Sequence, residues 1–85
     1  MPEEQFVRLN ADRLFVLELY RNDSTLRARA VDSVYRAHGS DSSAVATALG
    51  WYANHPERLA VMFDSTVALL ERRAAGSRNT KAGTP

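Results

Sequence analysis

The clearest hydrophobic pattern in the chain begins after Pro56. Apolar residues and one threonine recur there in steps of three and four, the spacing of a buried helix face: Leu59, Met62, Phe63, Thr66, Leu69 and Leu70. Pro56 suits the first position of a helix, and Gly76 is the expected stop. Acidic residues recur every seven positions on another side, where we expect solvent: Glu57, Asp64 and Glu71. The pattern predicts one long amphipathic helix.

Three helices are predicted before it, over about residues 3–21, 25–38 and 43–54. The side chains expected to face inward are Phe6, Leu9, Val16, Leu17 and Tyr20, then Leu26, Ala30, Val31, Val34 and Tyr35, then Val45, Ala48, Leu49 and Tyr52. Asp23 or Ser24 is a suitable N-cap for the second helix, and Gly39 suits its end. Gly50 lowers helix propensity, which we interpret as a need for close packing.

The fold class predicted from these patterns is all-α, because no alternating stretch is long enough to indicate a strand. We expect a compact bundle of four short helices over residues 2–74. Residues 75–85 contain no large apolar side chain and are expected to form a flexible tail, either disordered or left over from cloning.

Four apolar side chains fall outside the obvious inward faces: Phe15, Leu19, Trp51 and Val61. A helix that is apolar on most sides usually lies between partners or covers an oligomer contact. We predict that these four line a groove or a self-association surface. Arg13 lies beside the core face, so either its stem covers the core and its head reaches water, or it forms a buried pair with Asp64 or Asp32.

Composition narrows the classes of function. With 85 residues the chain is one domain, and 11 basic against 10 acidic residues give no excess of the kind that nucleic-acid binders show. No cysteine is present, and no apolar run approaches the roughly 18 residues that span a bilayer. We therefore expect neither a nucleic-acid partner nor a transmembrane segment.

No catalytic, cofactor or metal site is predicted. Two histidines are too few for a metal site without carboxylates at suitable spacing, and the chain contains no phosphate-binding loop and no nucleophile elbow. An unrecognised enzyme site around His38, His55 and Glu57 would need at least two of these side chains within hydrogen-bond reach of each other.

Several short motifs give the chain a resemblance to a known family. Pro2-Glu3-Glu4 opens a helix that contains Asp12; Tyr35 precedes His38-Gly39; Trp51-Tyr52 precedes His55-Pro56-Glu57; and Leu59, Leu70 and Glu71 follow. In this order, over residues 2–73, they resemble an uncharacterised domain family of small outer-membrane lipoproteins of Bacteroidetes and related bacteria. Here Trp51 stands where that family usually has tyrosine.

The resemblance implies a location on the periplasmic face of the cell envelope and no known activity or cofactor. The leader and the lipid-bearing cysteine of such lipoproteins are not in this sequence, so either the sequence is trimmed or this member is not lipidated. We expect a lipoprotein in the full-length form, with membrane association only through a lipid anchor that lies outside this sequence. We expect a non-enzymatic helical interaction module that binds an envelope protein or peptide, or a second copy of itself. The alternative is a chaperone-like binder of extended or unfolded peptides, which a cleft lined by Trp51 and Phe15 would favour.

Overall fold

Four helices account for almost all of the chain in a computed structural model. They are α1 (Glu3–Leu19), α2 (Ser24–Ala37), α3 (Ser42–Ala53) and α4 (Pro56–Ala82). The structure describes the backbone of residues 1–82 and the side chains of residues 1–76. Within that part of the chain there is no strand, so the predicted all-α bundle of four helices is confirmed.

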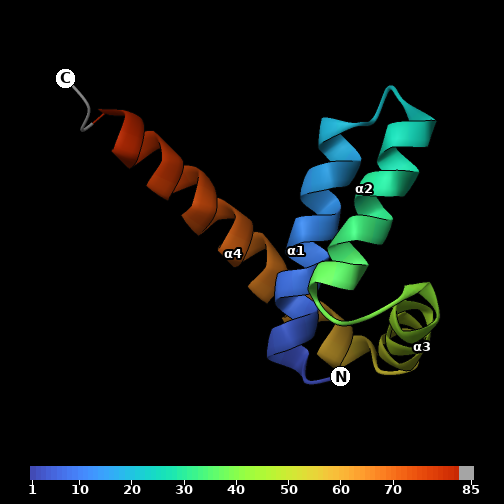
Figure 1. Ribbon diagram of the computed structural model, residues 1–85. Helices are drawn as coiled ribbons and strands as arrows, with labels where there is room; N and C mark the ends of the chain where they lie inside the picture. Colours follow the sequence, from blue (N-terminus) through green and yellow to red (C-terminus); the bar gives the residue numbers. More distant parts are fainter. Residues whose placement is uncertain (83–85) are drawn as a thin grey trace.

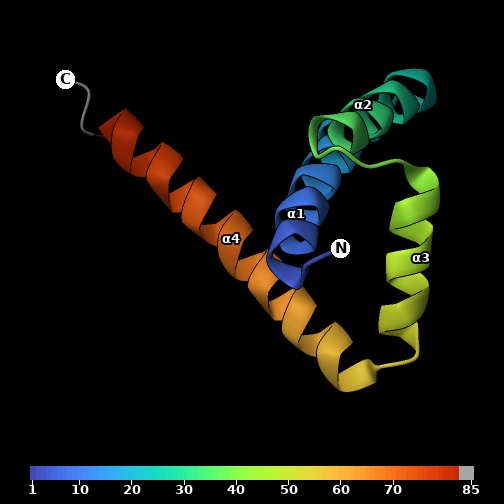
Figure 2. The ribbon, with the colours of Figure 1, turned by 60° about the horizontal axis from the view of Figure 1, so that its bottom comes forward.

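The helices are arranged around α1. Helices α1 and α2 run antiparallel, side by side, and α3 lies across the base of this pair (Figure 1). Helix α4 starts next to the end of α3, passes the N-terminal half of α1, and then projects away from the other three helices (Figure 2). The molecule therefore measures 48 × 32 × 23 Å, with α4 extending beyond the bundle.

Aspartate side chains cap the starts of α2 and α3. The Asp23 carboxylate accepts a hydrogen bond from the Leu26 backbone N–H at 3.0 Å and so caps α2. Asp41 caps α3 in the same way, accepting from Ala44 N–H at 2.8 Å. Helix α2 ends at Ala37 with His38 as its C-cap, and the next residue, Gly39, has a φ of 66°, the left-handed conformation that glycine adopts without strain.

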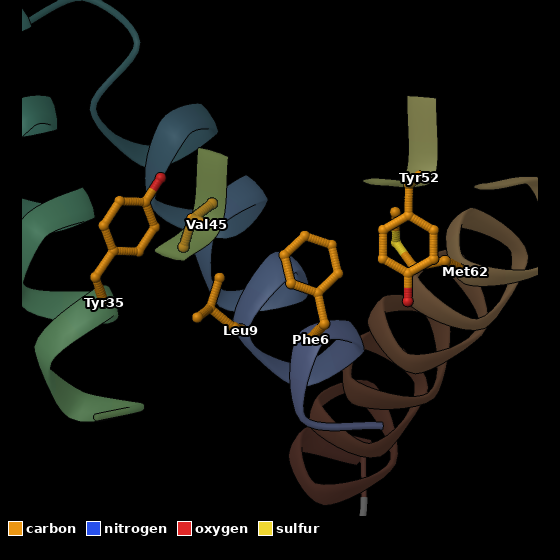
Figure 3. Packing of buried hydrophobic residues seen from close by; sticks show 6 residues of the cluster. All are labelled: Phe6, Leu9, Tyr35, Val45, Tyr52 and Met62. Atoms are coloured by element: carbon orange, nitrogen blue, oxygen red, sulfur yellow. The ribbon is translucent and has the colours of Figure 1, made fainter. Parts of the chain in front are cut away.

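The core is small and every helix contributes to it (Figure 3). Its large apolar members, each less than a tenth exposed, are Phe6 and Leu9 of α1, Tyr35 of α2, Val45 and Tyr52 of α3, and Met62 of α4. The rings of Phe6 and Tyr52 stack with centroids 5.3 Å apart. These side chains come from the predicted inward faces, because a helix buries the stripe that its neighbours can reach.

Two polar side chains are buried with this core, and both are hydrogen-bonded. Thr66 Oγ1 donates to the Met62 carbonyl at 2.8 Å, the bond to the preceding turn that makes threonine tolerable in a helix interior. Asn10 is 1% exposed and accepts from Arg13 Nη1 at 2.9 Å. Arg13 is thus half-buried over its own helix and bonded to Asn10; no contact with Asp64 or Asp32 occurs among the described residues.

Two predicted core residues are instead on the surface. Leu26 is 45% exposed and Phe63 is 44% exposed. Both lie at the edge of a stripe that is wider than a single neighbouring helix can cover, and α2 contacts mainly α1. Periodicity identified the apolar stripe, but the number of neighbours decided how much of it is buried.

Two further expectations, both about glycines, were wrong. The helix does not stop at Gly76 but continues to Ala82, because an isolated glycine costs only about 1 kcal/mol in a helix and does not by itself end one. The tail expected over residues 75–85 therefore begins inside α4, and residues 83–85 lie outside the described residues. Gly50 faces open space rather than a close neighbour, so packing does not require a glycine there.

Candidate functional site

A cluster of three charged or ionisable side chains joins α1, α2 and α4. One carboxylate oxygen of Asp12 lies 2.7 Å from His38 Nε2, and the other accepts a hydrogen bond from Arg73 Nη1 at 2.6 Å. His38 is the C-cap residue of α2, and its carbonyl also accepts from Gln5 Nε2 at 3.1 Å. Asp12 on α1 therefore bonds to both helices that pack against α1.

The environment of Asp12 favours its charged form. Burial alone would raise the pKa of this carboxyl, but the hydrogen bonds and charges of His38 and Arg73 outweigh burial and hold the pKa below its ordinary value. The carboxylate thus remains ionised at neutral pH and accepts from both partners.

An aspartate bonded to a histidine is also found in catalytic triads, where it orients the imidazole that activates a nucleophile. No hydroxyl donates to His38 within the described residues. Ser40 Oγ, two residues further along the chain, is buried without a hydrogen-bond partner among those residues. Asp12 is shared with Arg73, so the arrangement ties α1, the end of α2 and α4 together.

A hollow lies between the start of α1, α3 and the start of α4. It encloses about 660 Å³, and its walls are mostly apolar: Met1, Ala44, Ala48 and Trp51 line it together with Glu3, Thr47, Tyr52 and Arg58. Trp51 is 48% exposed, and one face of its indole stacks on His55 with ring centroids 4.1 Å apart. The lining thus combines aromatic side chains with two opposite charges, Glu3 and Arg58.

The two charged residues of the hollow form an ion pair, and the Tyr52 hydroxyl is hydrogen-bonded to the carboxylate of this pair. Glu3 accepts from Arg58 Nη2 at 2.6 Å and from the Tyr52 hydroxyl at 3.2 Å. Burial raises the pKa of Tyr52, and the negative charge of Glu3 raises it further, while Arg58 opposes the shift. Both carboxylate oxygens of Glu3 are thus bonded within the protein.

A second, shallower groove runs between α1 and α2 and is mostly apolar, with Asp12, Tyr20 and Ser33 as its polar members. It holds about 360 Å³, and Phe15, Val16 and Leu19 of α1 form one side. On α2 the other side consists of small or medium residues: Ala30, Ser33, Val34 and Ala37. Asp12 lies at one end, where it bonds to His38 and Arg73.

The four side chains predicted to meet a partner are all on the surface. Phe15 is 60% exposed, Leu19 59%, Trp51 48% and Val61 43%. The structure brings Phe15 and Leu19 together in the α1–α2 groove, whereas Trp51 lines the separate hollow and Val61 lines neither. That they bind a partner stays a prediction.

Apart from Met1, three exposed apolar side chains were not predicted to be exposed: Leu26, Phe63 and Val67. The first two had been assigned to the core, and Val67 had not been singled out. A signal for Phe63 and Val67 was present, because α4 carries apolar residues at more angular positions than one buried stripe needs.

The residues of the hypothetical enzyme site are not joined to one another. His38 bonds to Asp12, whereas His55 Nδ1 lies 2.7 Å from the Trp51 carbonyl. Across the described residues no hydrogen bond links any two of His38, His55 and Glu57, and no group of three or more possible ligands is placed to hold a metal ion. None of the described helices has the length and apolar character needed to cross a membrane.

Comparison with known proteins finds no matching family model, and no curated protein and no solved structure is similar enough to count as a match.

Proposed function

We propose that this protein is a non-enzymatic helical interaction module that binds an apolar segment of a protein partner in the groove between α1 and α2. The observation that carries the proposal is the position of Phe15 and Leu19, one helical turn apart, both about 60% exposed and both lining this groove. Large apolar side chains left in water at adjacent positions mark interaction surfaces in soluble domains.

The balance of buried and exposed apolar residues supports the same conclusion. Among the described residues, eight large apolar side chains are more than 40% exposed, compared with six large apolar members in the buried cluster. A folded domain gains free energy by covering such residues, at roughly 25 cal/mol per Å² of apolar area. A partner that covers the groove would supply that burial.

The groove proposal is tested by site-specific photocrosslinking in the cells that make the protein. A photoreactive phenylalanine analogue replaces Leu19 in one variant and Glu18 in the control; both positions are exposed neighbours on α1. We expect one or a few discrete adducts from position 19, absent from position 18 and lost when Phe15 is also changed to Ser. Adducts of equal yield from both positions, or none from either, would contradict the proposal.

A chaperone-like binder of extended or unfolded peptides is the second candidate. It is favoured by Trp51, which lines a hollow large enough to take peptide side chains. Against it, Trp51 and Phe15 line separate hollows, so they do not form the single cleft that this function was expected to use.

The two candidates differ in a measurable way. A chaperone-like protein suppresses the aggregation of a reduced, unfolded model client and loses this effect on Trp51→Ala. An interaction module with one partner leaves the aggregation unchanged. Trp51 is the only tryptophan in the chain, so a shift of its fluorescence on adding client reports directly on this hollow.

The proposed location, the periplasmic face of the cell envelope, rests on the sequence resemblance. Fractionation of the cells that make the protein tests it: recovery with envelope membranes or in the periplasmic fraction supports the location, and recovery with cytoplasmic proteins contradicts it.

A further inference from the structure

Helix α4 has a second apolar stripe next to the one buried against α1. The stripe advances in alternating steps of three and four residues, the spacing by which one helix packs along another; its members are Ala60, Phe63, Val67, Leu70 and Ala74. Phe63 is 44% and Val67 49% exposed, and Leu70 is half-buried. The stripe can accept a helix that the chain itself does not place there.

An acidic edge borders this stripe. Glu57, Asp64 and Glu71 are exposed and seven residues apart, and none of them forms an ion pair with a described residue. If two antiparallel α4 helices packed stripe to stripe, their acidic edges would face each other, because like flanking positions meet in antiparallel helix pairs. Repulsion between these carboxylates disfavours pairing of α4 with itself.

The α1–α2 groove carries the complementary charges. On α2 the groove residues Ala30, Ser33 and Ala37 are followed around the helix by an edge that contains Arg29 and Arg36, both exposed. Asp32 shares this edge and forms an ion pair with Arg36 at 3.1 Å. With two arginines and one aspartate, the edge keeps a net positive charge.

The acidic and basic edges have the same spacing. Arg29 and Arg36 are seven residues apart, as are Asp64 and Glu71. At a rise of 1.5 Å per residue, seven residues span about 10.5 Å on either helix, so both charge pairs can form in one register.

The surface area of the chain is also larger than a monomer of its size requires. It exposes 5928 Å², compared with about 5,000 Å² expected for a compact monomer of 9.4 kDa. The excess of about 900 Å² is close to the roughly 800 Å² that each partner buries in a stable interface. A partner copy would cover an area of this size.

We propose that the occupant of the α1–α2 groove is α4 of a second copy of this chain. The exposed stripe of the incoming α4, centred on Phe63 and Val67, lies on Phe15 and Leu19, and its Asp64 and Glu71 face Arg29 and Arg36. The α4 helix of each chain lies in the α1–α2 groove of the other chain, so the two chains form a closed two-fold dimer. This inference rests on the proposed function, since it names the partner that the groove binds.

The test is a charge exchange between two variants of the full chain. One variant carries Arg29→Glu and Arg36→Glu, and the other carries Asp64→Lys and Glu71→Lys. Each variant alone places like charges at the contact, so we expect its dimer dissociation constant to rise about tenfold or more at low salt. Mixed together, the two variants regain opposite charges at both contacts and should form a one-to-one heterodimer with nearly the affinity of the unmodified chain.

Sedimentation velocity over a range of concentrations gives the readout, with circular dichroism to show that each variant remains helical. Glu4→Lys with Glu18→Lys is the control. These exposed residues lie on α1 and take no part in the proposed contacts between the two copies, so the change should leave dimerisation unchanged. If the unmodified chain is a monomer at all concentrations, or if the mixture stays as weak as the separate variants, the second copy is not the occupant. Discrete crosslinks from position 19 to a different protein would then still support the proposed function, whereas their absence would remove both.

Discussion

Asp12 and His38 are 26 residues apart in the chain, yet their side chains meet at 2.7 Å, and the same carboxylate holds Arg73 at 2.6 Å. The contact ties the end of α2 and the second half of α4 to α1. It belongs to the fold and lies at the end of the groove proposed to bind a partner.

Replacing Asp12 should measure the strength of this tie. Asp12→Ala removes both hydrogen bonds, and we expect a loss of about 1–2 kcal/mol of unfolding free energy, since the bonds involve charged groups that are only partly buried. Asp32→Ala is the matched control: it removes an exposed pair with Arg36 within α2, which should cost about 0.5 kcal/mol or less. Urea unfolding followed by circular dichroism gives both values, and equal losses would contradict a special role for Asp12.

The lowered pKa of the Asp12 carboxyl should make the stability of the protein depend on pH. Its pKa is lower in the folded protein than in the unfolded chain, so its contribution is present above the unfolded value of about 3.9 and is lost as pH falls through the folded value. The thermal midpoint should therefore drop more steeply below about pH 4 in the unmodified protein than in Asp12→Ala. Parallel pH profiles for the two proteins would show that Asp12 does not contribute to acid unfolding.

Two leucines on α1 provide a test of the division between core and binding surface. Leu9 is fully buried and Leu19 is 59% exposed. Leu9→Ala should cost about 2–5 kcal/mol through lost burial and the cavity that remains, whereas Leu19→Ala should change stability by less than about 0.5 kcal/mol. Denaturant titration measures both, and partner binding should show the opposite sensitivity if Leu19 lies in the binding groove. Comparable destabilisation by both changes would place Leu19 in the core.

Two glycines should respond to alanine in opposite directions. A Cβ at Gly50 meets open space within a helix, so Gly50→Ala should stabilise the protein by up to about 1 kcal/mol through helix propensity. Gly39 has a φ of 66°, where a side chain is strained, and Gly39→Ala should destabilise by about 1 kcal/mol or more. Thermal unfolding distinguishes the two, and stabilisation by both changes would contradict the left-handed turn at Gly39.

Much of the local structure could be predicted from the sequence. Asp23 and Gly39 marked helix ends because capping depends on the residues within one turn, and the inward positions of Phe6, Leu9 and Met62 followed from their spacing. Phe63 could not be assigned correctly in the same way, since its burial depends on whether another helix lies beside it.

The candidate site, too, could be predicted from the sequence only in part. The surplus of apolar residues at Phe15, Leu19, Trp51 and Val61 was visible in the sequence, and the structure leaves all four exposed. Their grouping was not visible: two share a groove, and one lines a hollow elsewhere. The tie of Asp12 to His38 and Arg73 was also unpredicted, because it joins residues of three helices.

What the sequence by itself determined is the set of helices, their caps and the faces that can be buried, since these depend on interactions within a few residues of each other. What only the tertiary structure decided is which part of each apolar face finds a neighbour. Helix α4 passes the N-terminal half of α1 and then leaves the bundle (Figure 2), so Met62 is buried while Phe63, the next residue, remains in water. The reason is geometric: burial requires a surface on the opposite side, and the crossing of two helices provides one only where they meet.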